Sequence, residues 1–161
     1  SHDATAWCQR AAAILRDDES GICFRSQHGF CSTGSQISWL MPAPRSSQHL
    51  FTASSDPLAA SYKRFTFADP TIDAGLGARA TSSGTGNASL ELWRCWRHVL
   101  LQGGLANVVG AAAAQKMECQ LAAVEAEAMH AVGHAEAPAD GGTTFAVAVE
   151  RELSWMRAMK I

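Results

Sequence analysis

The feature that most constrains the fold is a long helical pattern in residues 105–134. Apolar residues recur there at intervals of three and four positions, the spacing that places side chains on one face of an α-helix. These residues are Val109, Ala113, Met117, Leu121, Val124, Ala128 and Val132. Several of them are small, which permits close approach of a neighbouring helix. The pattern predicts one long helix from about residue 105 to residue 134.

The composition supports a helical fold and limits the size of the hydrophobic core. Hydrophobic residues make up 47% of the 161 residues, and many of them are alanine. Alanine has the highest helix propensity but buries little area, so closely packed helices with a modest core are expected. Charged residues are only 17%, below the roughly 25% of average soluble proteins. Together with five tryptophans, a residue enriched at interfaces, this predicts surface covered by a partner.

Apolar periodicity predicts further helices on either side of the long one. The first covers about residues 4–19, with Asp3 as its N-cap. Its apolar stripe consists of Trp7, Ala11, Ile14 and Leu15. Two others cover about residues 90–101 and 145–160. The last of these places Phe145, Val149, Leu153 and Met156 on one side.

Residues 22–88 differ in character from the flanking segments. They contain four of the five prolines and most of the serine and threonine. Short strands are predicted at residues 36–41, 49–53 and 61–68, and residues 69–88 are rich in turn-forming residues. The last strand would place Lys63, Phe65 and Phe67 on one face and Tyr62, Arg64 and Thr66 on the other. We expect a loop-rich lobe or an extended arm laid over a partner.

The predicted fold is therefore mainly α, with three to four helices and a loop-rich middle segment that carries short strands. The helices are expected at about residues 4–19, 90–101, 105–134 and 145–160. Residues 1–21 would form an N-terminal helix, residues 22–88 the lobe or arm, and residues 89–161 a helical region. The three parts are interpreted as one structural unit.

One helical turn offers a candidate metal site. Glu127 and His130 form an E-x-x-H sequence, and His134 follows four residues later, so all three project to one side of a helix. Di-iron bundles use two such elements with two further glutamates, and this sequence holds one. A solvated polar face is the favoured interpretation, and we predict no cofactor. A metal site at these three residues is the alternative.

The cysteines do not form a complete disulfide framework. There are five, an odd number, and they are dispersed along the chain. Cys23, His28 and Cys31 are spaced too loosely for a typical zinc knuckle. Free thiols are the favoured interpretation, and a Cys23–Cys31 disulfide is the alternative.

The most unusual local cluster combines tryptophan and arginine. Trp93, Trp96 and Arg97 lie three and four residues apart, so they share a helical face. Trp155, which lies between Arg151 and Arg157, forms a second and weaker combination of tryptophan with arginine. Arginine stems packed over core tryptophans explain the cluster most simply. The other interpretation is an interface formed by these residues, with a partner protein or at membrane headgroup level.

These observations favour a binding role over catalysis. The balance of 13 Lys+Arg against 15 Asp+Glu argues against nucleic-acid binding, which needs many cations. No complete catalytic motif is present. We predict a non-catalytic accessory subunit, peripheral to a large organellar assembly. The most favoured assembly is a membrane-bound bioenergetic complex (respiratory, ATP synthase or photosynthetic).

The partners would be protein subunits, and a membrane surface would be reached only through the complex. The start at Ser1 would fit a mitochondrial or plastid protein after removal of a transit peptide. The alternatives are a metal-binding helical protein or enzyme and a secreted or luminal interaction module.

Overall fold

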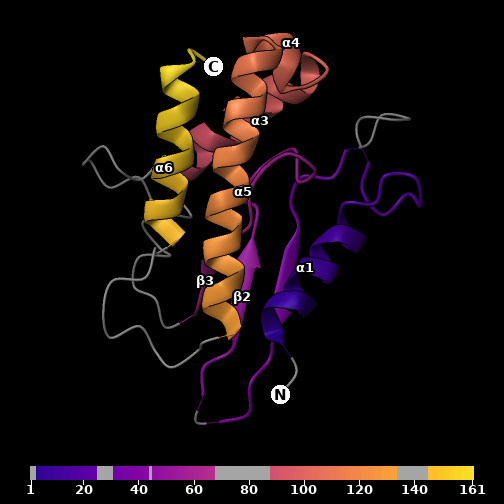
Figure 1. Ribbon diagram of the computed structural model, residues 1–161, viewed down its shortest axis with the longest axis vertical. Helices are drawn as coiled ribbons and strands as arrows, with labels where there is room; N and C mark the ends of the chain where they lie inside the picture. Colours follow the sequence, from indigo (N-terminus) through magenta and orange to yellow (C-terminus); the bar gives the residue numbers. More distant parts are fainter. Residues whose placement is uncertain (1–2, 25–30, 44, 68–87, 134–144) are drawn as a thin grey trace.

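The computed structural model describes residues 3–24, 31–43, 45–67, 88–133 and 145–161. These residues form five helices and one three-stranded sheet (Figure 1). The helices are α1 (Ala4–Leu15), α3 (Ala88–Leu101), α4 (Leu105–Val109), α5 (Ala111–Gly133) and α6 (Phe145–Ala158). A mainly α fold with short strands is consistent with the prediction, but the described helices number five rather than three to four.

The sheet is a small antiparallel meander. Its strands are β1 (Gln36–Trp39), β2 (Gln48–Phe51) and β3 (Lys63–Phe65), in the order β1-β2-β3. Each lies close to a predicted strand and is shorter than expected. The register pairs Phe51 with Lys63 and Leu50 with Arg64. Because side chains alternate along a strand, Phe51 and Lys63 share one face of the sheet and Leu50 lies on the other.

The larger core fills the space between the face that carries Phe51 and the helices α3 and α6. Buried residues of α3 and α6 recur at helical spacing. They are Leu92, Trp96 and Val99 on α3, and Phe145, Val149, Leu153 and Met156 on α6. The apolar side predicted for the last helix is therefore confirmed. The rings of Phe65 and Phe145 meet edge to face at 5.9 Å between centroids, joining β3 to the start of α6.

The smaller core lies where Leu50 and Tyr62 meet α1 and the C-terminal part of α5. The buried residues of α1 are all small: Ala4, Cys8 and Ala12. This corrects the predicted stripe, because Trp7 and Ile14 are 51% and 54% exposed. The close contact between α1 and α5 favours small side chains, since interhelical distance depends on the residues at the contact. The larger side chains consequently face outward.

Helix α1 begins as predicted and ends earlier. The Oδ1 atom of Asp3 accepts hydrogen bonds from the backbone N–H groups of Thr5 and Ala6, at 3.0 and 3.2 Å, which confirms the N-cap. The helix ends at Leu15 rather than Glu19. Asp17 explains the difference, because its carboxylate accepts from the backbone of the two residues at positions 19 and 20 and so stabilises a turn in competition with the helix.

The long helix predicted at residues 105–134 is divided in two at Gly110. This glycine has φ of +83°, a left-handed conformation that ends α4 and that other residues rarely adopt. Helix α5 starts immediately afterwards and runs to Gly133. Its predicted seam is confirmed where it is deepest, at Met117, Leu121, Val124 and Val132, all of which are buried.

Candidate functional site

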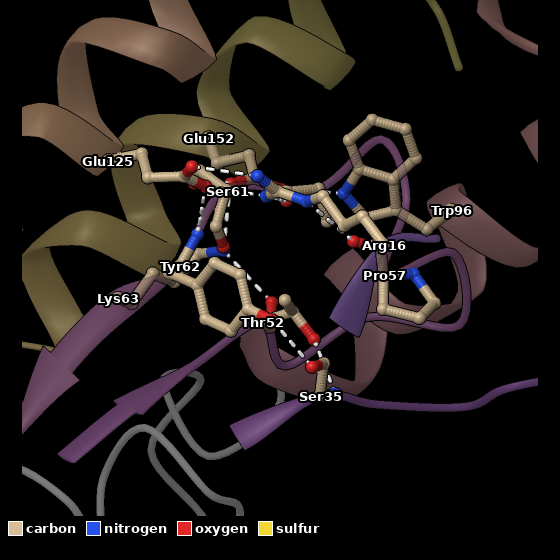
Figure 2. A network of polar contacts seen from close by, with 11 residues as sticks. Arg16, Ser35, Thr52, Pro57, Ser61, Tyr62, Lys63, Trp96, Glu125 and Glu152 are labelled. Carbon is tan, nitrogen blue, oxygen red and sulfur yellow. Dashed lines mark hydrogen bonds and ion pairs between the residues drawn. The ribbon is translucent and has the colours of Figure 1, made fainter. Parts of the chain in front are cut away.

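A charged pair is fully buried between β3 and α6 (Figure 2). The Nζ atom of Lys63 lies 2.8 Å from a carboxylate oxygen of Glu152, and neither side chain is exposed to solvent. The same ammonium group donates to the backbone carbonyls of Thr52 and Ser61, at 3.0 and 2.9 Å. An ammonium has three donors, so each has an acceptor inside the protein.

The carboxylate of Glu152 is equally well partnered. The indole Nε1 of Trp96 donates to one oxygen at 2.5 Å, and the hydroxyl of Ser61 donates to the other at 2.6 Å. One carboxylate of α6 is therefore connected to α3, to β3 and to the loop before β3. Buried ions are tolerated when they are paired and hydrogen-bonded in this way. The network is suited to fixing the fold.

A second network connects the end of α1 with α5. The guanidinium of Arg16 forms two parallel hydrogen bonds with the carboxylate of Glu125, at 2.7 and 2.6 Å. It also donates to the carbonyls of Pro57 and Ala60, and Glu125 accepts from the backbone N–H of Tyr62 at 2.9 Å. Burial by itself would lower the pKa of Arg16, but the hydrogen bonds and charge of Glu125 outweigh it and raise that pKa.

One pocket adjoins these networks, and another lies apart from them. One, of about 280 Å³, lies between α5 and the loop before β3, and its walls include Arg16, Glu125 and Ser61. The Ser61 hydroxyl donates to the same Glu152 oxygen that pairs with Lys63. The other, of about 400 Å³, is mainly apolar and is lined by Thr33, Phe51, Ala53, Ser54, Ser89, Leu90 and Trp93.

The predicted metal ligands are only partly described. Glu127 is exposed and its carboxylate lies 3.1 Å from the guanidinium of Arg151. His130 is exposed on the last turns of α5, and His134 lies outside the described residues. Within the described part of the chain, no three His, Cys, Asp or Glu residues are grouped as a metal site. Metal binding through His134 stays a prediction.

The tryptophan cluster divides between core and surface. Trp96 is completely buried and is held by Glu152, so it is a core residue and offers no surface to a partner. Trp93 is half-buried, with the guanidinium carbon of Arg97 5.5 Å from its ring centre. Trp155 is also half-buried and packs against the larger core. The core interpretation describes Trp96, while Trp93 and Arg97 remain accessible.

All five cysteines are free thiols in the structure. Cys23 is buried and Cys31 is half-buried, without a bond between them. His28, the third residue of the possible zinc set, lies outside the described residues. Burial raises the pKa of the Cys8 and Cys95 thiols, which makes them less reactive at neutral pH.

The least expected feature is an apolar surface at the start of the chain. Trp7 and Ile14 lie two helical turns apart, so they project from the same side of α1, and the guanidinium of Arg10 lies 5.5 Å from the Trp7 ring centre. Ile22 and Phe24 follow and are 48% and 44% exposed. We name Trp7, Ile14, Ile22 and Phe24 the α1 surface. Clustered exposed apolar residues of this kind commonly mark interaction sites.

The segment after α1 folds back towards the helix. The backbone N–H of Cys23 donates to the carbonyl of Asp17 at 3.3 Å, and Cys23 itself is buried. Ile22 and Phe24, its neighbours in the chain, are therefore held next to the helix end while remaining exposed. The apolar periodicity of the sequence predicted that Trp7 and Ile14 lie on one stripe of the helix, but it did not indicate that this stripe is exposed.

No protein-family profile matches this chain, and no solved structure matches it significantly. None of the helices in the described ranges is both long enough and apolar enough to cross a membrane.

Proposed function

We propose that this chain is a non-catalytic accessory subunit that binds another protein through the α1 surface. The observation that carries the proposal is the exposure of Trp7 and Ile14 on a helix whose small residues face inward. A chain with few large apolar residues gains most stability by burying them. Trp7 and Ile14 are two of the exposed large apolar side chains and lie on the same side of one helix, which is consistent with a partner that covers them.

The energetic gain from covering this surface is substantial for so few residues. Full burial of a large apolar side chain contributes about 1.5–3 kcal/mol. Trp7 and Ile14 are already half-covered, so completing their burial would contribute on the order of 2 kcal/mol. Tryptophan is also among the residues that most often dominate binding energy at interfaces.

The charged interior supports a structural role. Lys63, Glu152, Arg16 and Glu125 all have protein partners for their charges, and those partners come from different elements. Groups satisfied in this way hold the fold together and are poorly suited to proton transfer with a substrate. This favours binding over catalysis as the function.

The nature of the assembly is the second part of the proposal. We propose a peripheral position in a mitochondrial or plastid membrane complex, supported by the low charge content and near-neutral balance of the sequence. Fractionation of organelles from the source cells tests this point. The chain should sediment with the organelle membranes and be released by alkaline carbonate. Recovery with the soluble cytosolic fraction would contradict it.

The binding role is tested by native gel electrophoresis of the tagged chain in its source cells. The wild-type chain should migrate in an assembly much larger than 17.1 kDa. The double variant Trp7→Glu/Ile14→Glu should migrate as free chain, because a carboxylate at each position prevents apolar contact. Leu101→Glu is the matched control, since Leu101 is 64% exposed on α3 and lies outside the α1 surface.

Circular dichroism and a thermal melt of each purified variant show whether folding is retained. A folded Trp7→Glu/Ile14→Glu chain that stays in the assembly would overturn the proposal. So would a wild-type chain that migrates alone.

A further inference from the structure

We infer that the partner segment on the α1 surface is an amphipathic helix whose apolar stripe is flanked by lysine or arginine. This inference rests on the proposed function and names the chemistry of the partner at the same site. Three observations lead to it: the uncompensated acidic residues beside the surface, the helical spacing of its apolar residues, and the saturated backbone of α1.

The acidic residues follow directly after α1. Asp17, Asp18 and Glu19 are all exposed, and Asp17 is held in place by the hydrogen bonds to its carboxylate. With the described residues, Asp18 and Glu19 form no ion pair. The nearest cation in sequence, Arg16, is already occupied by Glu125. The acidic turn therefore offers negative charge that nothing in the described part of the chain neutralises.

Its position at the C-terminus of α1 increases the need for a cation. The C-terminal end of a helix carries partial negative charge, so carboxylates placed there are unfavourable and cations are favourable. A lysine or arginine from a partner would offset both the helix end and the three carboxylates. The hydrogen bond from Cys23 to Asp17 brings Ile22 next to this turn, so an exposed apolar side chain of the α1 surface lies beside the negative charge.

The shape of the surface fits a helix. Trp7 and Ile14 are separated by about 10.5 Å along the axis at 1.5 Å per residue. Ala6 and Ala13, which precede them, are small and exposed, which permits an approaching helix to come close. The backbone of α1 is bonded within the helix and cannot pair with an extended strand. A bound segment therefore cannot add to α1 as a strand, and a helix, which satisfies its own backbone, is the segment that suits this surface.

Two other occupants fit less well. An anionic lipid surface would repel Asp17, Asp18 and Glu19. A second copy of this chain that docked through its own α1 would bring Arg10 as the cation of that helix, against the same three carboxylates. Charge complementarity therefore selects a basic partner.

The test uses the purified full chain and two fluorescent synthetic peptides of equal length. Both form an amphipathic helix with a leucine stripe, and the polar positions are lysine in one and glutamate in the other. Fluorescence anisotropy should show the leucine–lysine peptide binding at least about tenfold more tightly, with affinity that falls as salt is added. Trp7→Glu/Ile14→Glu should remove this binding.

Charge reversal gives the decisive comparison. The variant Asp18→Lys/Glu19→Lys should lose the preference for the lysine peptide. The control Glu118→Lys/Glu150→Lys changes the net charge equally on α5 and α6 and should retain it. Equal loss in both variants, no preference in the wild type, or stronger binding to phosphatidylserine vesicles than to the peptide would each overturn the inference. If assembly depends on Trp7 and Ile14 while the peptide preference is absent, the proposed function stands and the basic helix is excluded.

Discussion

Among the ion pairs that attach α6 to the rest of the molecule, two differ sharply in their contact with water. Glu152 pairs with Lys63 of β3 at 2.8 Å, and neither side chain is exposed. Five residues later in the same helix, Arg157 pairs with Glu91 of α3 at 2.6 Å, with side-chain exposures of 51% and 42%. The exposed pair is the shorter of the two, so distance does not distinguish their contributions.

Solvation distinguishes them. In the exposed pair, both charges stay partly hydrated whether or not they are paired, and dissolved salt screens the attraction between them. Within the buried pair, each charge has lost its water and depends on its protein partners. Loss of one partner therefore leaves the other charge without compensation. The comparison within α6 indicates that an ion pair matters most for stability where neither charge can be hydrated if its partner is lost.

The largest effect is expected from Lys63→Met. This variant leaves the carboxylate of Glu152 buried without its counter-charge, which we expect to cost about 3–5 kcal/mol of unfolding free energy. Urea denaturation followed by circular dichroism measures it. Lys63→Met/Glu152→Gln removes both charges and keeps an acceptor for Trp96, so it should be more stable than the single variant. A loss below about 1 kcal/mol in Lys63→Met would show that burial does not govern this pair.

An intermediate effect is expected from His49, a buried group without an oppositely charged partner among the described residues. His49 is buried on β2, its Nδ1 lies 3.0 Å from the Ser38 hydroxyl, and the rings of Phe65 and Phe67 lie 5.1 and 4.7 Å from its centroid. Burial lowers the pKa of His49 below its ordinary value of 6.5. As pH falls, the unfolded chain is consequently protonated before the folded one. Stability that is fully present above pH 6.5 should decrease below it.

The measurement is the thermal midpoint at pH 7.5 and 5.5. The wild-type midpoint should fall between these values by more than that of His49→Gln. His98→Gln supplies the control, because His98 is exposed in the last turn of α3 and should leave the wild-type pH dependence unchanged. Identical pH dependence in the wild type and His49→Gln would mean that the folded protein accommodates the charge.

The smallest effect is expected from Arg157→Gln. Both Arg157 and Glu91 can be solvated after the substitution, so the urea midpoint should not change measurably at physiological salt. The hydrogen bonds from Arg157 lower the pKa of Glu91, and this shift should disappear from an NMR titration of the variant. A destabilisation comparable with that of Lys63→Met would remove the distinction between the two pairs.

Local features of the fold were predictable from the sequence, and relations between distant segments were not. The Asp3 cap, the Met117–Val132 seam and the apolar side of α6 depend on residues within a few positions of one another. The orientation of α1 depends on a neighbour far along the chain, because the side that faces α5 carries its smallest residues. Large apolar residues therefore predicted the wrong side.

The candidate site shows the same division. The sequence indicated that Trp7 and Ile14 lie together, but their exposure followed only from the packing of α1. Alternation along β3 placed Lys63 on one face without showing that this face is buried. Glu152 had no local signal either, since its partners come from β3, the preceding loop and α3.

The length of α5 has a consequence for how the molecule unfolds. Its N-terminal half contributes Met117 and Leu121 to the larger core, and its C-terminal half contributes Met129 and Val132 to the smaller one. One helix of 23 residues, about 35 Å long, thus belongs to both. If either core opens, α5 loses part of the packing that stabilises it. The two cores are therefore expected to unfold as one cooperative unit, with the slowest amide hydrogen exchange along the middle of α5.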